Sequence, residues 1–156
     1  MPSLNPRIVV AALSLSAAAF GGLVAYEGYS DTPITPIPGD KLTLGFGTTE
    51  GVKPGDKITP PKAVARALQD VAKYEGAVKQ CVSVPLTQYE YDAFLSLAYN
   101  IGPGNFCGST LVRVLNAGDY TEACKQILRW DRAQGKQVRG LTLRRQSEYR
   151  LCMGTT

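Results

Sequence analysis

A stretch of 19 residues without a charged side chain, Ile8 to Tyr26, places the strongest constraint on what this chain can become. A helix of about 20 apolar residues crosses a bilayer, so the stretch is just long enough to span one. Arg7 and the N-terminal amine precede it, and this positive flank predicts that the N-terminus stays in the cytoplasm. We therefore expect residues 1–26 to be a signal-anchor segment that exports the rest of the chain.

The segment is only weakly hydrophobic, because Ala, Ser and Gly make up more than half of it. Its larger apolar side chains contribute roughly −0.3 to −0.6 kcal/mol each, so insertion is favoured by only a few kcal/mol. Such an anchor can insert and later leave the membrane. Two alternatives stay open. Ala17-Ala18-Ala19 fits a signal-peptidase site, and the segment also fits a buried helix of a soluble protein.

The use of histidine and cysteine excludes several classes of site. The chain has no histidine, which rules out a Ser-His-Asp triad and any His-ligated metal. The cysteines never occur in a CxxC spacing, so a zinc ribbon is not expected, and we predict neither a metal nor a cofactor. An even number of dispersed cysteines instead fits disulfides in an oxidising compartment. The four are Cys81, Cys107, Cys124 and Cys152.

The remaining pattern indicates a small β region followed by helices, an α+β arrangement. Residues 31–56 are rich in Pro, Gly and Thr, and Pro38-Gly39-Asp40 is a turn signal between short apolar alternations, so we expect a hairpin there. From Thr59 onward the pattern is helical, and Thr87 to Glu90 forms a capping box. The predicted helices cover about 59–79, 87–101, 109–116, 119–132 and 141–153.

The helix map suggests how the cysteines pair. The last two helices should form an antiparallel hairpin, which puts Cys124 and Cys152 at similar heights at 1.5 Å per residue. Cys81 is then left to pair with Cys107. Sequence alone leaves the other connectivities open.

An acidic residue at the end of the apolar stretch suggests chemistry. Glu27 follows this stretch and precedes the predicted hairpin, which carries Asp40 and Thr43. Glycoside hydrolysis needs a carboxylic acid that protonates the leaving oxygen, and usually a second carboxylate. From the residues alone, Glu27 fits a solvated charge at a helix end equally well.

Glu27-Gly28 followed by Thr43-Leu44-Gly45-Phe46-Gly47 resembles the signature of the phage-type lysozymes, glycoside hydrolase family 24. The resemblance runs from about residue 26 to the C-terminus and implies a lysozyme-like catalytic domain over 27–156. Such a domain has a small β-hairpin lobe and a mainly helical lobe, here preceded by an N-terminal hydrophobic helix. Further matching segments include 98–102, 105–106, 109–111, 116–119, 129–130 and 140–145.

The resemblance implies a muramidase that cuts the β-1,4 bond between N-acetylmuramic acid and N-acetylglucosamine. Glu27 matches the general acid of the family, and Thr43 matches its threonine near the attacking water. The usual aspartate, nine residues after the glutamate, is replaced here by Pro36. Asp40 is the best substitute and Asp31 the second, although Asp40 also fits a simple turn residue.

Other positions match parts of the family's substrate cleft. Tyr99 and Asn100 match its floor, and Ser109 matches a sugar-contacting position, although Tyr99 also fits core packing. For Arg144 and Arg145 we expect a solvated helix face rather than contacts with glycan carboxylates.

The weak anchor resembles that of signal-arrest-release endolysins, which reach the periplasm tethered and act after release. We therefore expect a monomeric endolysin in the host inner membrane, facing the periplasm, that is later released to degrade peptidoglycan and lyse the host. A cleaved signal peptide would instead make it periplasmic from the start. Nucleic acid is not expected as a partner, because the net charge of +4 forms no basic stripe interleaved with aromatics.

Other functions remain as alternatives. A lytic transglycosylase also uses a glutamate as its acid and needs no second carboxylate. A catalytically inactive peptidoglycan-binding module would explain the displaced aspartate. A membrane-anchored structural protein would leave the resemblance after residue 26 unexplained.

Overall fold

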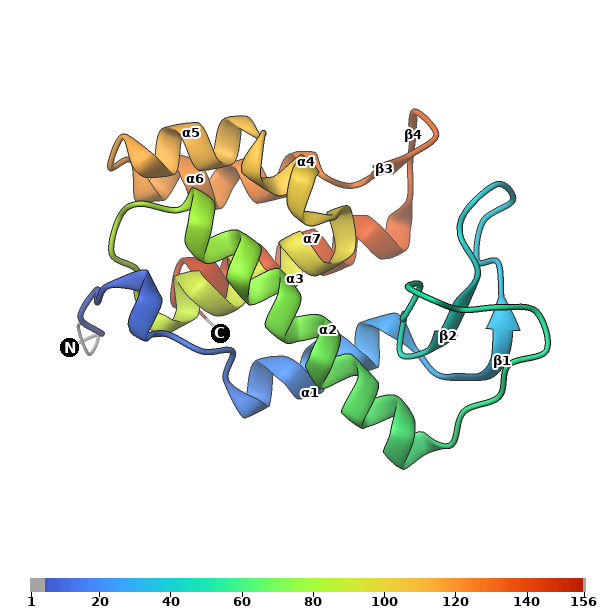
Figure 1. Ribbon diagram of the computed structural model, residues 1–156. Helices are drawn as coiled ribbons and strands as arrows, with labels where there is room; N and C mark the ends of the chain where they lie inside the picture. The colour runs from blue at the N-terminus through green and yellow to red at the C-terminus, as the bar shows by residue number, and fades with distance from the viewer. Residues whose placement is uncertain (1–4, 156) are drawn as a thin grey trace. The chain divides into compact units, whose positions relative to one another are not determined.

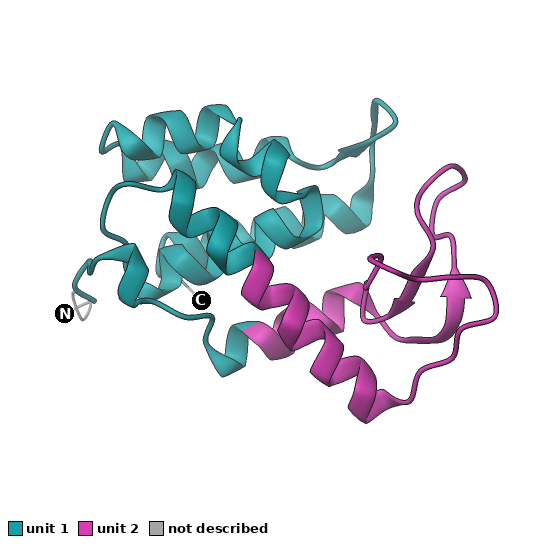
Figure 2. Ribbon diagram, in the orientation of Figure 1, with its two compact units in different colours: residues 1–19, 74–156 teal, residues 20–73 magenta. Residues whose placement is uncertain are grey.

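The computed structural model describes residues 5–155 and divides the chain into two compact units (Figure 2). The hairpin unit comprises residues 20–73, and the helical unit combines residues 1–19 with 74–156. Helix α1 (Ala17–Glu27) and helix α2 (Pro60–Cys81) each begin in one unit and end in the other.

The hairpin unit contains the predicted hairpin. Strands β1 (Ser30–Ile34) and β2 (Thr43–Gly45) are antiparallel, with Ser30 opposite Gly45 and Ile34 opposite Thr43 (Figure 1). The turn between them is closed by the amide of Asp40, which donates to the carbonyl of Ile37 at 3.0 Å. The turn signal at residues 38–40 therefore placed this connection correctly.

The helical unit is built around α3 (Gln88–Ile101), in which every residue from Glu90 to Tyr99 is buried. A helix buried on all sides must be surrounded by other elements. The predicted capping box is present, because the Thr87 hydroxyl accepts from the Glu90 amide while the Glu90 carboxylate accepts from the Thr87 amide. The elements that follow are α4 (Pro103–Cys107), α5 (Thr110–Asn116), α6 (Tyr120–Gln126), η2 (Ile127–Arg129), β3 (Arg132–Ala133), β4 (Lys136–Gln137) and α7 (Arg139–Cys152).

The helix expected over 119–132 ends earlier than predicted. After α6 and the single turn η2, the chain forms the small β3–β4 hairpin, which the sequence pattern did not reveal. Gln134 and Gly135 both have positive φ, at 50° and 76°, as a two-residue hairpin turn of this kind requires. The side chains of Gln137 and Thr142 both donate hydrogen bonds to the Asp131 carboxyl. These bonds, that of Gln137 most strongly, hold the pKa of Asp131 below its ordinary value.

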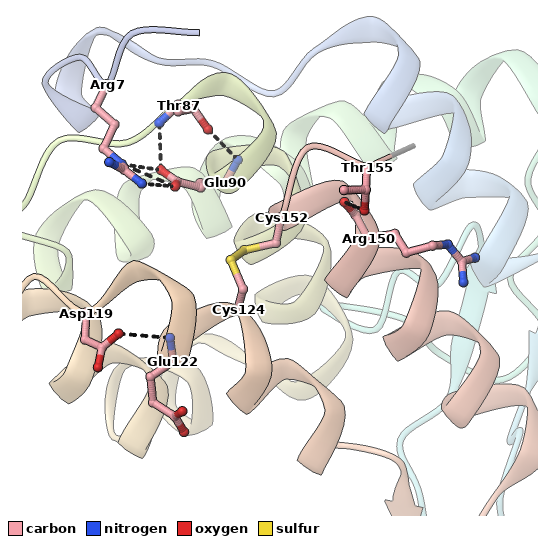
Figure 3. The surroundings of a disulfide bond; sticks show 9 residues. All are labelled: Arg7, Thr87, Glu90, Asp119, Glu122, Cys124, Arg150, Cys152 and Thr155. Atoms are coloured by element: carbon pink, nitrogen blue, oxygen red, sulfur yellow. Dashed lines mark hydrogen bonds and ion pairs between the residues drawn. A yellow bond between two sulfur atoms is a disulfide. The ribbon is translucent and has the colours of Figure 1, made fainter. Parts of the chain in front are cut away.

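Two disulfides cross-link the helical unit. Cys81 at the end of α2 is bonded to Cys107 of α4, and Cys124 of α6 is bonded to Cys152 of α7 (Figure 3). The Cα–Cα distances are 5.6 and 5.7 Å, within the usual range. These are the pairs expected from the helix map, and each closes a loop that restricts the unfolded chain.

The expected N-terminal hydrophobic helix over 8–26 is not one continuous helix. Ile8 forms a bridge with Leu86, a 3-10 turn η1 (Val10–Ala12) follows, and α1 begins only at Ala17. Polar contacts break the segment, as the amide of Leu15 donates to Glu75 at 2.7 Å. Residues 1–4 of the expected anchor lie outside the described residues. Within residues 5–155, no helix is both long and apolar enough for a membrane span.

Candidate active site

Glu27 is the last residue of α1, at the junction between this helix and the hairpin. Gly28 follows with φ of +68°, and its amide still donates to the carbonyl of Val24 at 3.1 Å. A glycine in this left-handed conformation ends a helix and turns the chain away. The Glu-Gly pair therefore leaves the half-buried Glu27 at the point where the chain turns from α1 toward β1.

Gly47 lies directly against this carboxyl. Because Ser30 pairs with Gly45, the chain leaving β2 runs beside the chain entering β1. A Cβ built on Gly47 would lie 2.9 Å from Oε2 of Glu27, closer than real Cβ atoms approach other heavy atoms. Gly47 also has φ of +82°. The positive φ favours glycine here, and any larger residue would have to displace the Glu27 side chain, which gives a physical reason for the Gly-aromatic-Gly pattern.

The other candidates in the hairpin unit lie on the two strands and in the turn between them. Thr43 is half-buried two residues away on β2, and its hydroxyl donates to the carbonyl of Lys41 at 3.3 Å. Asp40 is exposed in the turn, beyond Thr43. Asp31 is exposed on β1 and lines a small cavity with Lys57 and Lys62. The register thus places Thr43 nearer than Asp40 to the end of the hairpin that adjoins Glu27.

The helical unit carries the remaining candidates. Tyr99 is buried, and its ring centroid is 4.7 Å from that of Tyr74. Asn100 is exposed, and its Oδ1 accepts from Arg145 at 2.9 Å. Ser109 caps α5, since its hydroxyl accepts from the Val112 amide and donates to the Phe106 carbonyl at 2.6 Å. These contacts give each residue a structural role in this unit.

The expectation of a solvated face for Arg144 and Arg145 is wrong. Their side chains are 5% and 1% exposed, and both contact the buried carboxylate of Glu148, at 3.1 and 2.7 Å. Buried guanidinium groups need such an acidic partner, and Glu148 supplies it from the same helix α7. The positions of these residues along the helix could not show that their side chains point into the protein. Among residues 5–155, no group of three or more His, Cys, Asp or Glu side chains is arranged to hold a metal ion.

The family profile described as phage lysozyme matches residues 24–148. The chain belongs to the phage lysozyme family. The match covers the junction at Glu27, the hairpin and nearly all of the helical unit, so it confirms both the resemblance and the lysozyme-like α+β fold.

Individual members of the phage lysozyme family extend this comparison. The chain is 42% identical over 115 residues to an endolysin of Acyrthosiphon pisum secondary endosymbiont phage 1, covering 71% of this chain and 79% of that one. It is 37% identical over 142 residues to the SAR-endolysin of Pseudomonas phage phiKMV, covering 88% and 87%. The solved muramidase domain of SpmX from Asticaccaulis excentricus superposes with a TM-score of 0.81 at 29% identity, covering 90% and 97%.

One feature of this phage lysozyme was not predicted from its sequence. Thr48, which follows Gly47, donates to Asp70 of α2 at 2.6 Å, and both residues are buried. The two lie 22 residues apart, in a loop and a helix. No periodicity or short motif links such positions, although a polar residue directly after the Gly-aromatic-Gly pattern was a visible signal.

Proposed function

We propose that this phage lysozyme is a monomeric endolysin that hydrolyses the β-1,4 bond between N-acetylmuramic acid and N-acetylglucosamine in peptidoglycan. The observation that carries the proposal is the carboxyl of Glu27, held at a helix end against the backbone of Gly47. Relatives named endolysin and a solved relative named muramidase domain support it. Incubation with purified peptidoglycan, followed by mass spectrometry of the products, tests it.

In this proposal Glu27 is the general acid. It protonates the glycosidic oxygen as the C1–O bond breaks, while a water attacks C1 of N-acetylmuramic acid from the opposite face and loses a proton to a base. Thr43 positions this water through its hydroxyl. Tyr99, Asn100 and Ser109 are the proposed contacts with the glycan. The expected products have reducing muramic acid ends, whereas anhydro-muramic ends would identify a lytic transglycosylase and intact glycan an inactive binding module.

A pair of substitutions tests which residue, Asp40 or Asp31, acts as the second carboxylate. If Asp40 replaces the missing aspartate, Asp40→Asn lowers kcat about 10-fold or more, while Asp31→Asn has little effect. Both residues are exposed, so neither change should unfold the protein. If both variants keep wild-type kcat on soluble glycan fragments, Asp40 is not a catalytic base. Thr43→Ala should then be the most damaging change after that of Glu27.

The N-terminal contacts suggest how the enzyme is controlled, and we propose that this structure represents the form released from the membrane. Arg7 binds Glu90 of α3 at 2.8 Å (Figure 3). Its guanidinium also stacks over the ring of Tyr120, 3.6 Å from the ring centroid. Ser16 donates its amide and hydroxyl to Asp92, at 3.0 and 2.7 Å. With residues 8–26 spanning the bilayer, Arg7 would be cytoplasmic and Glu90 periplasmic, so these contacts require release. Relatives named SAR-endolysin support this order of events.

The same contacts explain why a tethered enzyme would be inactive. Ser16 also accepts from the amide of Ala19 at 3.1 Å, so the Asp92–Ser16 contact holds the beginning of α1. Glu27 is the last residue of this helix. While α1 lies in lipid, Asp92 cannot engage it and Glu27 remains at the headgroup boundary.

Strengthening the anchor should therefore delay lysis. Replacing Gly21 and Gly22 with Leu adds apolar surface that favours the bilayer, while a Cβ at either position meets no atom within 4 Å in the folded protein. We expect the double Leu variant to stay in the membrane fraction and to lyse cells later than wild type. The double Ala variant is the matched control, because it changes helix propensity with little added hydrophobicity. N-terminal sequencing of the periplasmic form provides the decisive check, since a start at Phe20 would show cleavage and refute release.

A further inference from the structure

A buried hydrogen bond joins α2 to the loop after β2, in which Gly47 lies against Glu27. The hydroxyl of Thr48 donates to Oδ2 of Asp70 at 2.6 Å. Thr48 is 3% exposed and Asp70 8% exposed, so the bond is largely shielded from water. A hydrogen bond to a carboxylate is stronger than one between neutral groups, and shielding from water strengthens it further.

Thr48 also closes the backbone turn that presents Gly47. Its amide and carbonyl exchange hydrogen bonds with those of Leu44, at 3.0 and 2.9 Å. The three residues between them include Gly45 and Gly47, with φ of +64° and +82°. These conformations are open to glycine but impose little order by themselves, because glycine populates many others. Contacts outside the turn help it to keep one shape: the ring centroids of Phe46 and Tyr29 lie 5.4 Å apart, and the side chain of Thr48 adds a direct link to α2.

The position of Gly47 determines the space around the acid. Its Cα lies so close to Glu27 that even a methyl group would stand 2.9 Å from Oε2. A shift of the turn by a fraction of an ångström would thus change how the carboxyl is held. Because a 1 Å misplacement of a catalytic group can cost about 100-fold in rate, this contact is sensitive enough to matter.

We propose that Thr48 and Asp70 are positioning residues for the general acid: their hydrogen bond sets the turn at residues 45–47, and the turn sets the carboxyl of Glu27. Neither residue needs to touch the substrate. The inference rests on the proposed glycosidase function, in which Glu27 is the acid.

Two exposed contacts join the same loop to the same helix and serve as controls. Lys73 forms an ion pair with Glu50, and Arg66 donates to the carbonyl of Glu50 at 2.7 Å. The Lys73 and Glu50 side chains are 60% and 68% exposed. Hydrogen bonding to Lys73 lowers the pKa of Glu50, but an exposed pair is screened by salt and holds the loop only weakly.

The test measures kcat and KM on soluble peptidoglycan fragments well below the melting temperature. Thr48→Val keeps the shape of the side chain and removes its hydroxyl, and we expect kcat to fall about 10- to 100-fold with KM within about 3-fold. Thr48→Ser keeps the hydroxyl and should retain wild-type kcat within about 3-fold. The matched control Lys73→Ala should leave both constants unchanged.

A double variant separates positioning from stability. Thr48→Val alone leaves the Asp70 carboxylate without its donor, which destabilises the fold, whereas Thr48→Val with Asp70→Leu removes both polar groups and restores stability. If the pair positions Glu27, the double variant regains the melting temperature while kcat stays low. Recovery of kcat together with the melting temperature would overturn the proposal, as would a Thr48→Ser variant as impaired as Thr48→Val. Failure of the proposed function itself would look different, because wild type would then release no glycan products.

Discussion

Replacing Glu27 with Gln should lower kcat on peptidoglycan by about two orders of magnitude or more while leaving the protein folded. Gln has nearly the same shape as Glu, so it fits beside Gly47, where the Glu27 carboxyl already leaves no room for a further methyl group. An amide, however, cannot deliver a proton to the leaving oxygen. Without protonation the alkoxide leaves poorly, so the chemical step slows while glycan binding persists. Clearing of permeabilised cells and kcat on soluble fragments measure the effect.

The matched control is Glu50→Gln, an identical change at an exposed carboxylate in the same hairpin unit. It should clear cells at the wild-type rate. Circular dichroism and the melting temperature show whether each variant is folded. Near-normal clearing by a folded Glu27→Gln protein would mean that another residue provides the acid, and the mechanism proposed above would then be abandoned.

Replacing Glu148 with Gln should cost about 3–5 kcal/mol of stability, because it removes one partner of a buried ion pair. The carboxylate of Glu148 is 2% exposed and contacts the guanidinium groups of Arg144 and Arg145. It also accepts a hydrogen bond of 2.7 Å from the hydroxyl of Ser96 on α3, so it links α7 to α3. The neutral amide of Gln would leave the two buried guanidinium groups without a negatively charged partner. Urea unfolding with the disulfides intact gives the change in free energy.

A control in the same unit is Glu122→Gln on α6. Glu122 is half-buried and accepts only from the side chain of Gln126 among the side-chain hydrogen bonds found within residues 5–155. An amide oxygen can accept this bond equally well, so the free energy of unfolding should change by less than about 1 kcal/mol. If Glu148→Gln were no more destabilising than this control, the buried cluster of Arg144, Arg145 and Glu148 would not be a main source of stability.

The elements that could be predicted from the sequence depend on local interactions. The capping box at Thr87 and Glu90 satisfies amides at the first turn of its own helix, so four consecutive residues suffice to identify it. The hairpin turn at residues 38–40 likewise follows from the conformations that Pro and Gly allow. The end of α1 at Glu27 and Gly28 is also set locally, since the positive φ of Gly28 stops the helix.

The features that the sequence did not reveal concern contacts between distant segments. The run of residues 8–26 has the composition of a membrane helix, and no local signal shows that Glu75 and Asp92 accept hydrogen bonds from Leu15 and Ser16. Arg144 and Arg145 were expected to be solvated because arginine usually is. Their burial depends on a carboxylate that the fold turns inward, and that orientation is a property of the assembled helices.

The site shows the same division at the scale of single residues. The sequence by itself determined that an acid ends a helix, that a glycine follows it, and that a glycine-rich turn comes after a threonine on the second strand. Only the tertiary structure decided that Gly47 lies against the Glu27 carboxyl and that Thr48 donates a hydrogen bond to Asp70. Backbone conformation is set within a few residues, so sequence pattern reports it. A contact across 22 residues exists only after the hairpin has packed on α2, because only packing excludes the water that would otherwise bind both partners.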